Sequence, residues 1–194
     1  MDNRLLLFMV GFLQKRVIRA IFASLIHNAP VVVDDSASDD SALSVAETVL
    51  WRHPDWNVAV VLETKSEDPQ KIRERYESAC RRLRRVSTKR WHVALAIPNL
   101  QEWALIDEHV RQEYAKIHQD PSAAATPEER AKIELMNFYA LATKIGEWVE
   151  EKPFDLETLK RKSRQVCELC TFIEKSLQPK PEPEPEPVTA ADWF

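Results

Sequence analysis

Carboxylates follow two of the apolar segments in this chain. Asp34 follows the apolar run 30–33, and Glu63 follows the run 56–62, with Asp68 five residues further on. Such runs are typical of buried parallel strands, whose carboxyl ends share one edge of a sheet and commonly bind ligands there. Glu63, Asp68 and Asp34 could therefore form a catalytic site, with Glu63 and Asp68 as magnesium ligands, because Mg²⁺ prefers anionic oxygen. Equally, Asp34 could solvate a loop and Asp68 could cap a helix.

The densest charge in the chain is basic and lies in residues 71–90. This segment holds nine basic and two acidic residues, a local net charge of +7, in a chain whose formal net charge is −4. Such a stripe could contact nucleic-acid phosphates without reading base sequence, or it could pair with acidic groups elsewhere in the chain. The residues that we predict for nucleic-acid binding are Arg81, Arg82, Arg84, Arg85, Lys89 and Arg90.

Residues 179–194 differ in composition from everything before them. Proline alternates with glutamate there, which favours extended polyproline II, so we expect an exposed tail. The tail finishes with Asp192, Trp193 and Phe194, and large aromatic side chains are preferred anchors at interfaces. We therefore predict that a protein partner binds Asp192, Trp193 and Phe194, unless these aromatics fold back onto the body of the protein.

The elements that must position these residues can be read from hydrophobic patterning. Four continuous apolar runs predict strands at residues 4–10, 30–33, 56–62 and 91–97. Amphipathic stretches between them predict helices, so residues 1–118 form an α/β domain, a mostly parallel sheet with helices on both faces. Beyond residue 126 the periodicity is purely helical, which predicts a C-terminal α-helical hairpin over residues 126–178, packed on the sheet domain.

Composition excludes several kinds of protein. The chain has only two glycines, so a Walker-type phosphate loop and a GxGxxG dinucleotide fingerprint are both excluded. Three cysteines do not make a disulfide framework, and we expect a reducing, cytoplasmic location. The apolar run 5–13 is far shorter than the roughly 20 residues of a membrane span. Charged residues flank it, so we expect no membrane association.

Three short segments near the predicted strand ends point to a family. Val10-Gly11-Phe12 closes the first strand, Glu63-Thr64-Lys65 closes the third, and Gln101-Glu102-Trp103 follows the fourth. With the alternation of strands and helices, this pattern resembles small bacterial Toprim-like proteins, relatives of topoisomerases, primases and overcoming-lysogenization-type nucleases. The resemblance covers about residues 4–110 and implies a Toprim/Rossmann-like sheet. In that family a glutamate after the first strand and a later Asp-x-Asp pair hold magnesium for phosphodiester chemistry.

The same segments depart from the family at its acidic positions. Gly11, Lys65 and Gln101 stand where the resemblance implies acids, and an ammonium group repels Mg²⁺. We therefore predict a protein with degenerate catalytic acids and no cofactor. It would be a non-catalytic component of a bacterial or phage DNA-transaction or defence assembly, binding nucleic acid, a protein partner or both. Two alternatives stay open, a magnesium-dependent nuclease and an adaptor that docks through its C-terminal tail.

Overall fold

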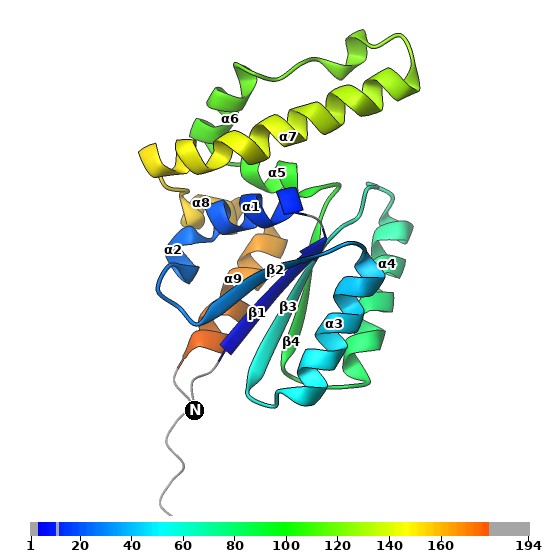
Figure 1. Cartoon of the computed structure of the whole chain (residues 1–194), viewed down its shortest axis with the longest axis vertical. Helices are drawn as coiled ribbons and strands as arrows, with labels where there is room; N and C mark the ends of the chain where they lie inside the picture. The colour runs from blue at the N-terminus through cyan, green and yellow to red at the C-terminus, as the bar shows by residue number, and fades with distance from the viewer. Residues whose placement is uncertain (1–3, 11, 179–194) are drawn as a thin grey trace, which may run out of the picture.

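A four-stranded parallel sheet forms the centre of the computed structural model, which describes residues 4–10 and 12–178 (Figure 1). Its strands are β1 (Arg4–Val10), β2 (Val31–Ser36), β3 (Trp56–Glu63) and β4 (Trp91–Ala96), in the order β2-β1-β3-β4. Leu5 of β1 lies opposite Val31 of β2 and Asn57 of β3. The predicted α/β architecture with a parallel sheet is confirmed, whereas Gly11 and the tail with Asp192, Trp193 and Phe194 lie outside the described residues.

Alternate residues of β3 point to opposite faces of the sheet. Val58, Val60 and Leu62 face a layer made by α3 (Asp39–Arg52) and α4 (Pro69–Arg84). Their neighbours Ala59 and Val61 belong to the core on the other face. Because both faces are covered, β3 reads in sequence as one uninterrupted apolar run.

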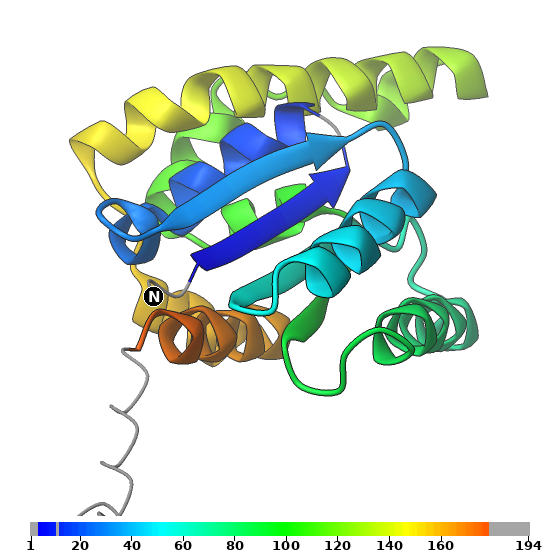
Figure 2. The same cartoon turned by 60° about the horizontal axis from the view of Figure 1, so that its bottom comes forward.

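The second face of the sheet carries α1 (Phe12–Ile21) and α9 (Arg164–Leu177) (Figure 2). Beyond α1 lie α5 (Leu100–Leu105), α6 (Glu108–Ala115) and the long α7 (Pro127–Glu151), which packs along α1. The shorter elements are α2 (Ala23–Ile26), the 3-10 helix η1 (Pro121–Ala123) and α8 (Leu156–Lys162). Within the described residues, no helix has the length and apolarity needed to span a membrane.

Two helices that the sequence predicts as continuous are broken by internal caps. Periodicity predicts one helix over residues 100–119, but α5 ends at Leu105. Asp107 then caps the start of α6 and accepts hydrogen bonds from the backbone N–H of His109 and Val110. Ser163 likewise separates α8 from α9 and accepts the N–H of Val166. Asp and Ser both compete for local backbone groups, which favours caps over helix interiors.

The C-terminal helices differ in their packing from the expected hairpin. The described part of the chain ends with α8 and α9, and α9 packs directly on β4 and β1. The Gln165 side chain at the start of α9 accepts the N–H of Leu95 in β4 at 3.2 Å. α7 instead packs on α1 and α6. One of the two expected hairpin helices is therefore part of the layer that covers the sheet.

Candidate functional site

The carboxyl edge of the sheet holds the acids that could bind a metal, and one lysine forms ion pairs with two of them. Lys15 of α1 places its Nζ atom 3.0 Å from Oδ1 of Asp35 and 3.4 Å from Oδ1 of Asp34, at the end of β2. The Lys15 side chain is only 22 % exposed. One ammonium group therefore offsets one of the two negative charges of this pair.

The other two candidate ligands are engaged by helix starts. One carboxylate oxygen of Glu63, Oε1, accepts the backbone N–H of Leu100, the first residue of α5, at 3.0 Å. Asp68 is the N-cap of α4 and accepts the N–H of Gln70 at 2.9 Å. Both carboxylates satisfy amide groups that a helix start leaves without a partner.

These contacts involve the residues of the alternative metal site. In the described part of the chain, no three His, Cys, Asp or Glu side chains come together in a group that could hold a metal ion. Glu63, Asp68 and Asp34 do not form such a group, and magnesium binding by these residues stays a prediction. Asp68 caps its own helix, whereas Glu63 and Asp34 each have a partner on another element of the fold.

The segment after β3, where the resemblance implies Asp-x-Asp, is held by the backbone that follows β4. Lys65 has a φ of 53°, the left-handed region that residues with a Cβ rarely adopt. Its N–H donates to the carbonyl of Pro98 at 2.7 Å, and the hydroxyl of the buried Thr64 donates to the carbonyl of Ser66 at 2.7 Å. This turn is fixed by its own hydrogen bonds.

A small polar cavity also lies at this edge and was not predicted from the sequence. Its volume is about 280 Å³. Gln101 donates from Nε2 to the Tyr114 hydroxyl at 3.0 Å, and burial raises the pKa of Tyr114. The cavity is lined by Glu63, Asn99, Gln101, Tyr114, His118, Pro121, Glu134, Asn137 and Phe138. Its residues come from elements and connecting loops far apart in sequence, so no local motif announces it.

The basic segment divides into two groups, and the first is used inside the fold. Arg82 of α4 donates from Nη1 to Asp40 at 2.9 Å and from Nη2 to Glu47 at 2.8 Å, both on α3. Arg75 pairs with Asp39 at the start of the same helix. The hydrogen bond with Glu47 is the first cause of the raised pKa of Arg82. These two arginines therefore join α3 to α4.

Arg90 is also structural. Its guanidinium donates to the backbone carbonyls of His53 and Trp56, both at 2.9 Å, and of Leu50 at 2.7 Å. It thus closes the end of α3 and joins it to the start of β3. The sequence predicts Arg82 and Arg90 as nucleic-acid ligands, but their guanidinium groups are occupied by contacts within the chain.

The second group of cations points to solvent. Arg81, Arg84, Arg85 and Lys89 are exposed. Arg81 lies near Glu77 and contributes to the lowered pKa of that carboxyl, whose first cause is the hydrogen bond from Arg73. Within the described residues, Arg84, Arg85 and Lys89 form no ion pair. The charge available to a ligand is therefore concentrated at the last turn of α4 and in the connection to β4.

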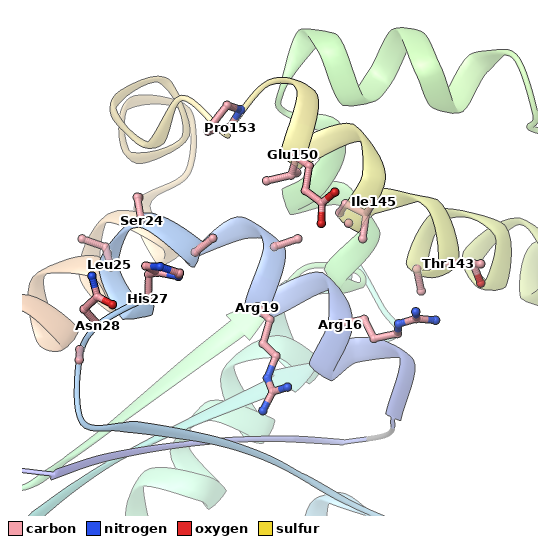
Figure 3. A pocket seen from close by; sticks show the side chains of 16 residues that line it. Arg16, Arg19, Ser24, Leu25, His27, Asn28, Thr143, Ile145, Glu150 and Pro153 are labelled. Atoms are coloured by element: carbon pink, nitrogen blue, oxygen red, sulfur yellow. The ribbon is translucent and has the colours of Figure 1, made fainter.

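A larger groove is lined by residues of α1, α2 and α7, beside the contact between α1 and α7 (Figure 3). Its volume is about 950 Å³, and much of its wall is made of small residues, Ala20, Ala23, Ala142 and Gly146 among them. A Cβ built on Gly146 meets nothing within 4 Å. In Figure 3 the guanidinium of Arg19 points away from α7. The groove is thus mainly apolar, and the sequence did not predict it.

Comparison with protein-family models, with curated proteins and with solved structures finds no match. Function must consequently be inferred from the geometry of the two sheet edges. The carboxyl edge has acids that pair with Lys15 or accept hydrogen bonds from helix starts. The opposite edge has exposed cations.

Proposed function

We propose that this chain is a non-catalytic, Toprim-like component of a bacterial or phage DNA-transaction or defence assembly, and that it binds nucleic acid through Arg84, Arg85 and Lys89. The observation that carries the proposal is the division of the basic segment. Arg75, Arg82 and Arg90 have partners within the chain, whereas these three cations form no ion pair among the described residues. A cluster of exposed cations attracts phosphates independently of base sequence.

The acids at the carboxyl edge support the absence of catalysis. The Lys15 ammonium lies against Asp34 and Asp35, and Glu63 accepts an amide hydrogen bond from Leu100. A divalent ion would compete with the Lys15 ammonium at Asp34 and Asp35, and with the Leu100 amide at Glu63. We expect purified protein to cleave neither DNA nor RNA with magnesium or manganese. Metal-dependent nicking that is lost in Glu63→Ala would contradict the proposal and favour the nuclease.

Nucleic-acid binding is tested with a charge-reversal variant, Arg84→Glu, Arg85→Glu and Lys89→Glu, in fluorescence anisotropy at several salt concentrations. We expect weaker binding to every sequence, and a slope of log affinity against log salt that falls by about 1 for each phosphate that the variant no longer binds. The matched control reverses three exposed cations elsewhere, Arg130→Glu, Lys132→Glu and Lys152→Glu, with the same change in net charge. Equal reductions in both variants would show a general charge effect and no site.

A further inference from the structure

Trp51 exposes its indole ring beside these cations. Its side chain is 75 % exposed, whereas Trp103 and Trp148 are buried and Trp56 and Trp91 are half-buried. It is the most exposed tryptophan in the described part of the chain. An indole in water presents a large apolar, polarisable face, and such faces are typical of surfaces that bind a ligand or a partner.

Two interactions place Trp51 at the same corner of the molecule as the exposed cations. Arg82 in the last turn of α4 holds Glu47 of α3, and Arg90 holds the carbonyl of Leu50, next to Trp51. The ends of α3 and α4 therefore lie side by side at the amino ends of β3 and β4, as both views show (Figures 1 and 2). Arg52, Arg85 and Lys89 are exposed around this corner.

The structural role of cations at helix ends accounts for only part of this arrangement. Cations near a helix C-terminus interact favourably with the helix dipole, and Arg52 and Arg84 occupy such positions. The dipole gives no reason for an exposed indole at the same place. Glu47, the acid of α3 closest in sequence to Trp51, is already paired with Arg82. This corner therefore combines an exposed aromatic side chain, Trp51, with exposed cations.

We propose that this corner binds single-stranded nucleic acid, with one unpaired base stacked on Trp51 and the neighbouring phosphates held by Arg52, Arg85 and Lys89. The inference rests on the proposed function and adds the strand type. Every base has an aromatic face, so stacking is tolerant of sequence. In a duplex both faces of each internal base are covered by neighbouring bases, so Trp51 has no face to contact there. Phosphate contacts, by contrast, are available in both forms.

The test compares Trp51→Ala with the unchanged protein by fluorescence anisotropy on oligo-dT and on a duplex of equal length. We expect Trp51→Ala to weaken oligo-dT binding about tenfold, because the variant lacks the aromatic face on which a base would stack. Duplex affinity and the salt slope should stay unchanged, since the cations are intact. Tyr139→Ala, which removes a side chain that is 60 % exposed on α7, is the matched control and should change neither affinity.

Trp51→Phe supplies a second measurement that is independent of the size of that effect. It keeps an aromatic face, so most of the oligo-dT affinity should remain, while the quenching of tryptophan emission on binding should largely disappear. Persistent quenching in Trp51→Phe would place the base on another tryptophan and overturn the proposal.

The outcomes of these measurements separate this inference from the proposed function. If Trp51→Ala binds oligo-dT as the unchanged protein does, while the charge-reversal variant loses affinity, stacking is wrong and nucleic-acid binding stands. If the unchanged protein binds neither oligonucleotide at low salt, both proposals fail. Sedimentation could show that the unchanged protein is a dimer and that Trp51→Ala is a monomer. The indole would then contact a second copy of the chain, and the inference would be overturned.

Discussion

The two edges of the sheet use their charged residues in opposite ways. At the carboxyl edge Asp34 and Asp35 are paired with Lys15, and Glu63 accepts a backbone amide. At the amino edge, Arg90 closes the fold through three carbonyls. Arg85 and Lys89, close to it in sequence, are exposed and form no ion pair within the described residues.

The number of charges in a segment does not decide how those charges are used. Residues 71–90 and the acidic segment 34–40 are both strongly charged, yet part of the charge of each segment is used in ion pairs between α3 and α4. Asp39 and Asp40 accept from Arg75 and Arg82. The cations that remain available to a ligand, which form no ion pair within the described residues, lie at the end of α4 and in the connection to β4.

The greatest change in stability should follow removal of the structural cation of the amino edge. Arg90→Met removes a guanidinium that donates to three carbonyls and leaves those oxygens without their charged donor. We expect a loss of about 2–4 kcal/mol in the free energy of unfolding, because hydrogen bonds to charged groups contribute about 1.5–3 kcal/mol each and are not additive. Urea unfolding measures it.

Lys89→Met is the adjacent control for Arg90→Met. It removes an exposed cation, so we expect a change within about 0.5 kcal/mol in the free energy of unfolding, together with weaker nucleic-acid binding. If the two substitutions destabilised the protein equally, the division between structural and available cations at this edge would be wrong.

The sequence predicts the sheet because each strand carries its own evidence. The run 56–62 is apolar almost throughout and forms β3, with bounds that differ by one residue. The helix breaks at Asp107 and Ser163 are missed because the apolar periodicity continues past each cap. The mostly parallel sheet with helices on both faces was therefore predictable, and the precise helix boundaries were not.

The use of the charged residues was not predictable from local sequence. Arg82 meets Glu47 across 35 residues, and Arg90 meets Leu50 across 40. Lys15 meets Asp34 and Asp35 across 19 and 20. Each pairing depends on how α1, α3 and α4 sit against the sheet, which is a property of the fold. The exposed Trp51 could have been noticed as an aromatic residue beside Arg52, but its exposure could not.

At the carboxyl edge, Glu63→Ala should have a smaller effect on stability than Arg90→Met. The substitution removes the acceptor of the Leu100 N–H, and loss of a capping side chain costs about 1 kcal/mol. Thermal melting or urea unfolding measures the loss, and nucleic-acid affinity should not change. Glu67→Ala, an exposed acid in the same loop, is the control and should be neutral. A drop in nucleic-acid affinity on Glu63→Ala would bring the carboxyl edge into the binding site.

His92 in β4 should make the free energy of unfolding depend on pH. This effect arises in the interior and is distinct from the charged groups at either edge of the sheet. Burial lowers its pKa, an effect that Glu168 partly opposes, and the ring stacks on Phe172 with centroids 5.4 Å apart. As pH falls below the unfolded value of 6.5, the unfolded chain binds a proton that the folded state resists. Stability should therefore decrease, by at most about 0.7 kcal/mol between pH 7 and pH 6.

The His92→Leu variant should show a flatter dependence of unfolding free energy on pH over that range. If the slope of unfolding free energy against pH were unchanged in His92→Leu, the pH dependence would belong to other groups.

The smallest effect on stability should come from substitution of Lys15. It tests whether this lysine hinders metal binding by the acids of the carboxyl edge. In Lys15→Met the carboxylates of Asp34 and Asp35 lose their ammonium partner. Partly exposed ion pairs contribute little, so we expect a loss of about 0.5 kcal/mol in the free energy of unfolding at low salt. Because salt screens such pairs, the difference from the unchanged protein should shrink as sodium chloride is added.

Magnesium chloride at equal ionic strength should raise the melting temperature of Lys15→Met more than that of the unchanged protein, since only the variant leaves the two carboxylates without a cation. Equal responses to magnesium would mean that Lys15 does not neutralise this edge, and the contrast between the two edges would then need another cause.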